Sequence, residues 1–161
     1  GVAHALLLHR ARHPLASPSA KPALPQAGDG DARLVAELRR QLEDLHAYRE
    51  PELKVADLAA RLGVPEHRVS RLIGQSLGEA NFNQWVNRHR VAHARRLLAD
   101  PACSASILDI SGDAGFASLG PFNRAFKAAT GMTPSAYRTA ARQAPKDVAT
   151  GTGAPADACA G

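Results

Sequence analysis

A short stretch of mixed polar residues carries the side chains best suited to chemistry in this chain of 161 residues. His67, Arg68, Ser70 and Arg71 fall within a few residues of one another, at positions that leave Val69 for an apolar inner face. Side chains of these types donate and accept hydrogen bonds and reach base edges in a DNA major groove. An ordinary solvated helix face has a similar composition, so this stretch alone supports DNA contact and a plain surface equally.

Two short helices must position these side chains. Ala59 is small enough for two helices to approach closely, and Gly63, four residues later, can adopt the positive φ of a tight turn. Val69, six residues further on, faces inward and closes the angle between the helices. This spacing is typical of a helix-turn-helix unit, which we predict over residues 52–78. Short helical hairpins of other kinds can imitate the pattern.

A long helix is predicted next, over residues 81–99. Apolar residues keep helical phase from Phe82 to Leu98, a rise of roughly 25 Å at about 1.5 Å per residue. The pair Asp100 and Pro101 is expected to end it. Such a helix would fix the separation of the units at its two ends.

A second helix-turn-helix unit is predicted over residues 106–138. Gly115 and Phe116 form its turn, and Ser118 is expected to cap the following helix. Gly131 ends that helix, and Thr133 with Pro134 opens a last short one. We therefore predict an all-α fold, with two helix-turn-helix bundles joined by a long linker helix.

The remaining chain divides by composition. Residues 1–30 are rich in Pro and Gly and are expected to form a leader and linker, while residues 142–161 are expected to form a disordered tail. The domain would then span residues 31–141. Asp31 is expected to cap a helix with a stripe of leucines on one face: Leu34, Leu38, Leu42 and Leu45. We expect this stripe to cover the next unit. A two-stranded coiled coil is the alternative, but the stripe is short for one.

The chain begins with Gly1, so we expect a fragment or a processed protein. Leucines at positions 6–8 precede basic residues. Two interpretations of this stretch stay open: an unstructured leader, or the end of an upstream sensor domain or membrane span.

Composition, charge and the absence of certain motifs limit the classes of function that this sequence supports. Lys and Arg exceed Asp and Glu by five, and the isoelectric point is about 9.8, which suits a polyanionic partner without requiring one. His89 and His93 share the spacing of a zinc motif, but Arg90 occupies the position of its glutamate. The sequence has no glycine-rich phosphate loop and no serine nucleophile elbow. We therefore expect no enzyme, no metal and no cofactor.

Several segments together resemble the DNA-binding domain of AraC/XylS-type transcriptional regulators, over about residues 38–138. The strongest match is in the second unit: Gly115-Phe116, Phe122-Asn123-Arg124-Ala125-Phe126-Lys127 and Gly131-Met132-Thr133-Pro134-Ser135-Ala136-Tyr137-Arg138. The first unit agrees in Leu58-Ala59, Leu62-Gly63-Val64, Ser70-Arg71-Leu72, Asn87-Arg88 and Arg90-Val91. Residues 48–53 and Asn81-Phe82 also resemble a subgroup whose N-terminal half is a multi-span membrane sensor.

The resemblance implies two recognition helices that enter successive major grooves. Base contacts carry over to the following residues: His67, Arg68, Ser70, Arg71, Leu119, Asn123 and Arg124. Many family members have polar residues at the positions of Leu119 and Gly120. We therefore expect the first unit to make most base contacts, and the second to act more through contacts with the DNA backbone and through DNA shape.

Phosphate contacts form a separate set of predictions. Basic side chains and two helix N-termini are the candidates: Arg88, Arg90, Ser118, Lys127 and Thr133. For Arg90 an internal pairing with a carboxylate is an equal alternative.

The expected function is sequence-specific regulation of transcription on double-stranded DNA. Expected partners are a promoter or operator, RNA polymerase if the protein activates, and a second copy through a region outside this chain. The expected location is the cytoplasm, on the nucleoid or as part of a membrane-anchored regulator. Leu119 and Gly120 keep two alternatives open, a helical protein-interaction module and a non-specific DNA-backbone binder.

Overall fold

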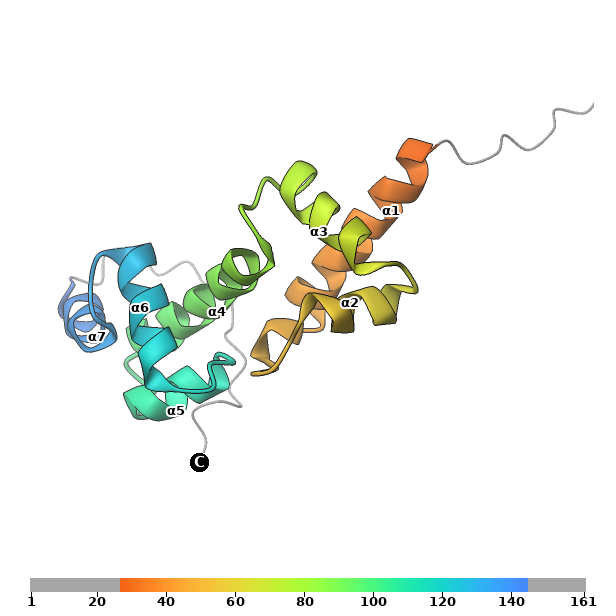
Figure 1. Cartoon of the computed structure of the whole chain (residues 1–161). Helices are drawn as coiled ribbons and strands as arrows, with labels where there is room; N and C mark the ends of the chain where they lie inside the picture. The colour runs from red at the N-terminus through yellow and green to blue at the C-terminus, as the bar shows by residue number, and fades with distance from the viewer. Residues whose placement is uncertain (1–26, 145–161) are drawn as a thin grey trace, which may run out of the picture.

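The computed structural model describes residues 27–144, and this part of the chain folds into helices joined by short loops, without a β-strand. The predicted all-α class is confirmed. Figure 1 shows α4 between two groups of helices, with α1 to α3 on one side and α5 to α7 on the other. The two predicted units and the long helix between them are present in the predicted order.

The first group contains three α-helices and two short helical turns. They are α1 (Ala27–Arg39), the π-helical turn η1 (Arg40–Asp44), the 3-10 turn η2 (Ala47–Arg49), α2 (Val55–Leu62) and α3 (Glu66–Gln75).

The turn between α2 and α3 has the predicted construction. Ala59 is 3 % exposed, Val69 is fully buried, and Gly63 ends α2 with φ of 67°. The Val64 amide then donates to the Ala59 carbonyl over 3.0 Å. A side chain at position 63 would be strained in this left-handed conformation, which is why the turn uses glycine.

The long helix α4 (Phe82–Ala99) begins where Asn81 accepts a hydrogen bond from the Gln84 amide, at 2.9 Å. It ends at Asp100, directly before Pro101, as predicted. Its buried residues face both groups of helices, with Trp85 and Val86 toward the first and Leu97 and Leu98 toward the second.

The second group consists of α5 (Ile107–Asp113), α6 (Leu119–Thr130) and α7 (Pro134–Gln143). Gly131 ends α6 with φ of 75°, and the Thr133 hydroxyl caps α7 by accepting from the Ala136 amide. Both features were predicted.

Two separate apolar cores hold these groups together. The first combines α1, η1, η2, α2, α3 and the start of α4. The second combines the later part of α4 with α5 to α7, where Phe122 and Phe126 are fully buried, each contributing about 1.5–3 kcal/mol.

Three local expectations, on Asp31, Ser118 and Arg142, were wrong. α1 begins at Ala27, so Asp31 lies inside the helix rather than at its cap. The leucine stripe packs on the first core as predicted through Leu34, Leu38 and Leu42, whereas helix geometry changes at η1 and leaves Leu45 54 % exposed. The Ser118 hydroxyl makes no capping bond, although Ser118 holds the N-cap position of α6.

The composition predicts a tail from residue 142, but Arg142 belongs to α7. Its guanidinium donates to the Leu98 carbonyl at 3.0 Å and to the Cys103 carbonyl at 2.7 Å. These two bonds tie the last helix to the end of α4. The expectations for residues 1–26 and 145–161 lie outside the described residues.

Candidate nucleic-acid interface

The outward face of α3 carries a row of three positions spaced one helical turn apart. The row consists of His67, Arg71 and Gly74, which are all exposed. The opposite face of the helix is buried in the first core and carries Val69, Leu72 and Ile73. A side chain built at Gly74 would meet nothing within 4 Å. The end of this row is therefore bare backbone that a ligand could approach closely.

Arg68 lies on the flank of α3 that faces α1. Its guanidinium donates to Asp31 Oδ1 at 2.9 Å, and Arg71 Nη2 lies 3.3 Å from Asp31 Oδ2. One carboxylate from α1 therefore pairs with both predicted reading arginines. All three side chains are only partly buried, between 35 % and 50 % exposed, so they stay accessible to a ligand.

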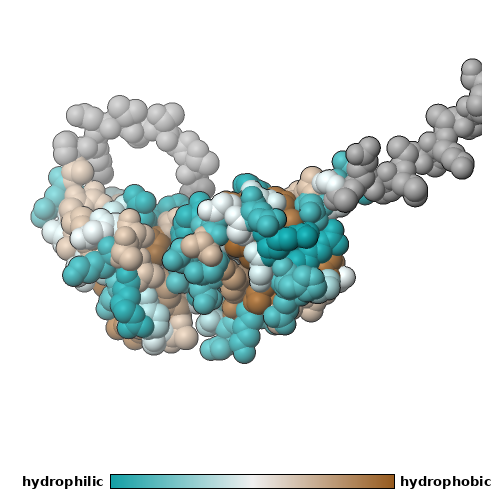
Figure 2. All heavy atoms as spheres, turned by 45° about the horizontal axis from the view of Figure 1, so that its top comes forward, coloured by the Kyte–Doolittle hydropathy of each residue, from teal (hydrophilic) through white to brown (hydrophobic). Residues whose placement is uncertain are grey.

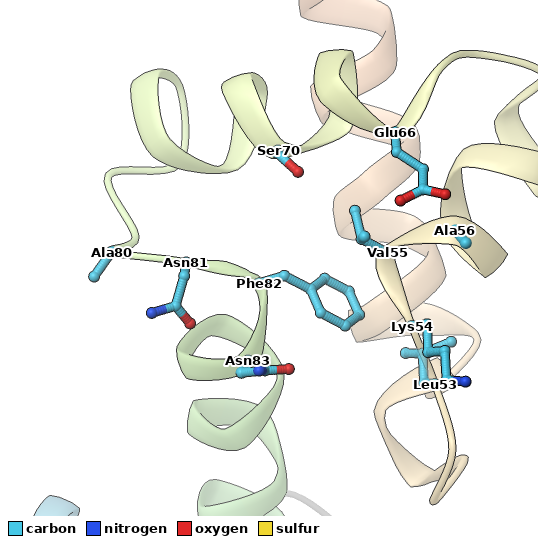
Figure 3. A pocket seen from close by; sticks show the side chains of 10 residues that line it. All are labelled: Leu53, Lys54, Val55, Ala56, Glu66, Ser70, Ala80, Asn81, Phe82 and Asn83. Carbon is cyan, nitrogen blue, oxygen red and sulfur yellow. The ribbon is translucent and has the colours of Figure 1, made fainter.

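Ser70 lies on the opposite flank, beside a groove between α3 and the starts of α2 and α4. Figure 3 shows Ser70 and Glu66 at one edge of this groove, with the ring of Phe82 pointing toward Val55 across it. Lys54 contributes a basic side chain to its lining. Ser70 is thus exposed, but it stands at the edge of the outward face rather than in its central row.

On α6 the corresponding row is Gly120, Arg124 and Lys127, opposite the buried Phe122 and Phe126. Asn123 is exposed beside this row, and Leu119 is 36 % exposed at the start of the helix. The row presents two cations and no side chain at position 120. Like the row on α3, it combines two hydrogen-bonding side chains with one glycine.

The predicted phosphate contacts of α4 separate into one exposed and one internal arginine. Arg88 is 63 % exposed and pairs with Glu79. Arg90 is half-buried and donates to the carbonyls of Tyr48 at 2.7 Å and Glu50 at 2.8 Å. Burial lowers the pKa of Arg90. The internal alternative therefore describes Arg90, with backbone carbonyls instead of a carboxylate as its partners.

The two helix N-termini differ in their local bonding. Ser118 is exposed, and its hydroxyl makes no capping bond to α6. Thr133 is exposed as well, but its hydroxyl already accepts from the Ala136 amide at 3.2 Å. Only the N-terminus of α6 thus combines a hydroxyl without a capping bond with the exposed start of a helix.

Figure 2 shows the side of the molecule reached by bringing the top of Figure 1 forward. Hydrophilic side chains predominate in its right half, with small hydrophobic patches between them. Among residues 27–144, no group of three His, Cys, Asp or Glu side chains could hold a metal ion. No helix in that same range is long and apolar enough to cross a membrane.

The pairing of Asp31 with Arg68 and Arg71 is not predictable from the sequence, since Asp31 and Arg68 are 37 residues apart. The same holds for Tyr48, which bonds His93 on α4, and for Arg49, which pairs with Asp113 of α5. The positive charge of Arg68 and Arg71 on one helix was the only signal that a carboxylate could lie nearby.

Comparison with known proteins agrees with this geometry. Residues 58–140 match a family model described as a helix-turn-helix domain. The regulatory protein PocR of Salmonella typhimurium is 30% identical over 103 residues, which cover 64% of this chain and 33% of PocR. The chain thus spans about a third of that relative's length.

Two solved structures are also similar. The C-terminal domain of AraT, a response regulator from Geobacillus stearothermophilus, matches with a TM-score of 0.62 and 26% identity, over 72% of this chain and 91% of that one. The DNA-binding domain of the global transcriptional factor AdpA, solved with a target DNA, matches with a TM-score of 0.58 and 29% identity, over 67% of this chain and 92% of that one. Fold, motif order and sequence similarity together show that this chain belongs to the AraC-type helix-turn-helix family.

Proposed function

We propose that this chain is the DNA-binding part of a transcription regulator and recognises a specific double-stranded sequence. The observation that carries the proposal is the outward row of α3, where His67 and Arg71 stand on a rigid helix-turn-helix unit. Family membership and the similarity to the AdpA domain solved with its target DNA support it. The chemistry is binding rather than catalysis.

In this proposal α3 and α6 enter successive major grooves on one face of the duplex, about one helical turn apart. Arg71 donates to O6 and N7 of a guanine, while His67 and Ser70 contact neighbouring bases. Arg68 stands on the flank beside α1, so it contacts the base or backbone at the edge of the site.

The second unit contributes less direct reading. Asn123 and Arg124 are its polar candidates, and Leu119 can touch a thymine methyl group without a hydrogen bond. Arg88, Lys127 and the N-termini of the helices behind Ser118 and Thr133 hold phosphates. Arg90 is left out of this set, because its guanidinium bonds two backbone carbonyls.

The wider setting follows from a DNA target. The protein acts on a promoter or operator in the cytoplasm, with RNA polymerase as a partner if it activates. Dimerisation would use an N-terminal region outside this chain.

Selection of duplexes from a random pool, followed by titration of the winner at two salt concentrations, tests the proposal. A motif with two parts about one turn apart, bound about 10³-fold tighter than random DNA, is the expected result. A steep salt dependence without any motif would instead indicate a backbone binder. Absence of binding would favour a protein-interaction module.

A further inference from the structure

The two groups of helices meet at a short segment that precedes both helix-turn-helix units. The turn η2 (Ala47–Arg49) lies against α4 and against the end of α5. Its Tyr48 hydroxyl is 3.1 Å from His93 Nδ1 on α4, and Arg49 Nε donates to the Asp113 carbonyl of α5 at 3.0 Å. Arg49 also pairs with the Asp113 carboxylate. This turn of the first group thus bonds to α4 and to α5 of the second group.

Gly115 lets the backbones of η2 and the second unit approach closely. It has φ of 98°, and a Cβ at this position would overlap the Tyr48 carbonyl and lie 2.8 Å from Arg49 Cα. Backbone meets backbone here, so no rotation of a side chain could make room. Gly112, only three residues away, has open space where a Cβ would stand.

His93 bridges the junction. It is 6 % exposed, with Nε2 at 2.6 Å from Asp113 Oδ2. Nε2 carries a proton, because a carboxylate can only accept from it. Burial lowers the pKa of His93 and so favours the neutral ring, in which Nδ1 accepts from the Tyr48 hydroxyl; Arg96 Nη2 lies 3.3 Å from the same nitrogen. The neutral ring with its proton on Nε2 thus links Asp113 on one side to Tyr48 on the other.

Directional bonds connect the two groups of helices at this junction, because the apolar cores on either side are separate from each other. The first core extends along α4 to Val86, and the second begins at Val91. Between them, Arg90 bonds the carbonyls of Tyr48 and Glu50 and lies over the Phe116 ring, 5.5 Å from its centroid. Hydrogen bonds with defined angles fix an orientation more narrowly than apolar contact does.

We propose that η2 and its partners Arg49, His93, Asp113 and Gly115 set the angle and separation between α3 and α6, and thereby the half-site spacing that the domain accepts on DNA. This inference rests on the proposed function. These residues are positioning residues, because they act through the placement of the two recognition helices without contacting the bases.

The test measures binding of the whole chain to duplexes carrying the selected motif with its two parts moved apart by one to about five base pairs, half a helical turn. The wild-type chain is expected to prefer one spacing by about tenfold or more. Gly115→Ala should flatten this preference to about threefold or less, since the added methyl group separates the two backbones. Binding to a single half-site should stay unchanged.

Gly112→Ala is the matched control, with the same added methyl group on the same segment but no neighbour to displace. It should keep the wild-type spacing profile. If Gly115→Ala does not fold by circular dichroism, Arg49→Gln replaces it, since it removes the charge that pairs with Asp113 and leaves the backbone intact.

The outcomes separate the inference from the function on which it rests. A folded Gly115→Ala or Arg49→Gln variant with the wild-type spacing profile would overturn the inference alone, as would a wild-type chain that binds every spacing equally. An equal loss of affinity at all spacings would mean that the junction only stabilises the fold, and it would also overturn the inference. A wild-type chain that binds no DNA would remove the proposed function as well.

Discussion

The carboxylate of Asp31 on α1 pairs with the guanidinium of Arg68 on α3, with Oδ1 and Nη2 2.9 Å apart. Its second oxygen faces Arg71 at 3.3 Å. A negative charge from outside the helix-turn-helix unit therefore stands beside the two arginines that would meet DNA. DNA phosphates and Asp31 attract the same cations, so this pair must weaken or rearrange when the arginines contact DNA.

Replacing Asp31 with Asn should strengthen binding to any duplex, because it frees both arginines and removes a charge that repels phosphate. We expect about a two- to fivefold gain, in keeping with about 0–1 kcal/mol for an exposed ion pair. Fluorescence anisotropy with random and selected duplexes measures this gain.

Glu37→Gln provides a control for Asp31→Asn, with the same change of charge on the same helix. Glu37 bonds Arg40 and Gln41 rather than α3. It should change DNA affinity less than Asp31→Asn does. Equal gains in the two variants would assign the effect to net charge and not to the released arginines.

Replacing Arg71 with Ala should cost about 1–3 kcal/mol of binding free energy on the selected sequence and little on others. The reason is that a bidentate contact to guanine discriminates between bases, whereas a phosphate contact does not. Arg39→Ala, which removes an exposed charge from the last turn of α1, is the comparison. A uniform loss on all sequences would rule out direct reading by Arg71.

Stability should decrease as the pH falls below about 6.5, the ordinary pKa of histidine. Burial lowers the pKa of His93 despite its bond to Asp113, with Arg96 and Arg49 acting in the same direction as burial. Burial also lowers the pKa of His89, with Arg88 and Arg39 assisting and Glu43 and Glu79 opposing.

The sign follows from which state binds protons first. The unfolded chain protonates these histidines at their ordinary pKa, while the folded chain does so only at a lower pH, so acid favours unfolding. Their contribution is complete above about pH 6.5 and is lost as the pH falls toward the folded values. Urea unfolding at pH 8 and pH 5.5 measures the difference.

His89→Phe should reduce this pH dependence and raise stability by about 1 kcal/mol at neutral pH. The His89 Nε2 atom is buried without a hydrogen-bond partner, and its ring stacks on Tyr48 with 5.9 Å between centroids. A phenyl ring keeps the stacking and removes the unpaired nitrogen. An unchanged pH profile in this variant would leave His93 as the main source of the effect.

Two glycines should respond in opposite ways to alanine. Gly112 lies inside α5 with open space around it, so Gly112→Ala should stabilise the domain by about 0.5–1 kcal/mol through helix propensity. Gly63 has equal space but a φ of 67°, so Gly63→Ala should destabilise it by about 1 kcal/mol. Thermal unfolding of both variants checks the pair, and a loss of stability in Gly112→Ala would contradict it.

Local signals determined which helices form and where the turns lie. Ala59, Gly63 and Val69 act over ten residues, and Thr133 with Pro134 acts over one turn, so their roles follow from steric limits and capping that hardly depend on the rest of the chain. The outward positions of α3 could be predicted from the sequence in the same way, because helical periodicity assigns each residue to a face.

Tertiary structure alone decided which charged side chains meet. Asp31 pairs with Arg68 across 37 residues, and Arg49 pairs with Asp113 across 64. The internal bonds of Arg90 depend likewise on η2 folding back onto α4. Such pairs depend on how each helix is rotated and packed against distant ones. Periodicity places a side chain on a face, but only the assembled fold determines which group stands opposite to it.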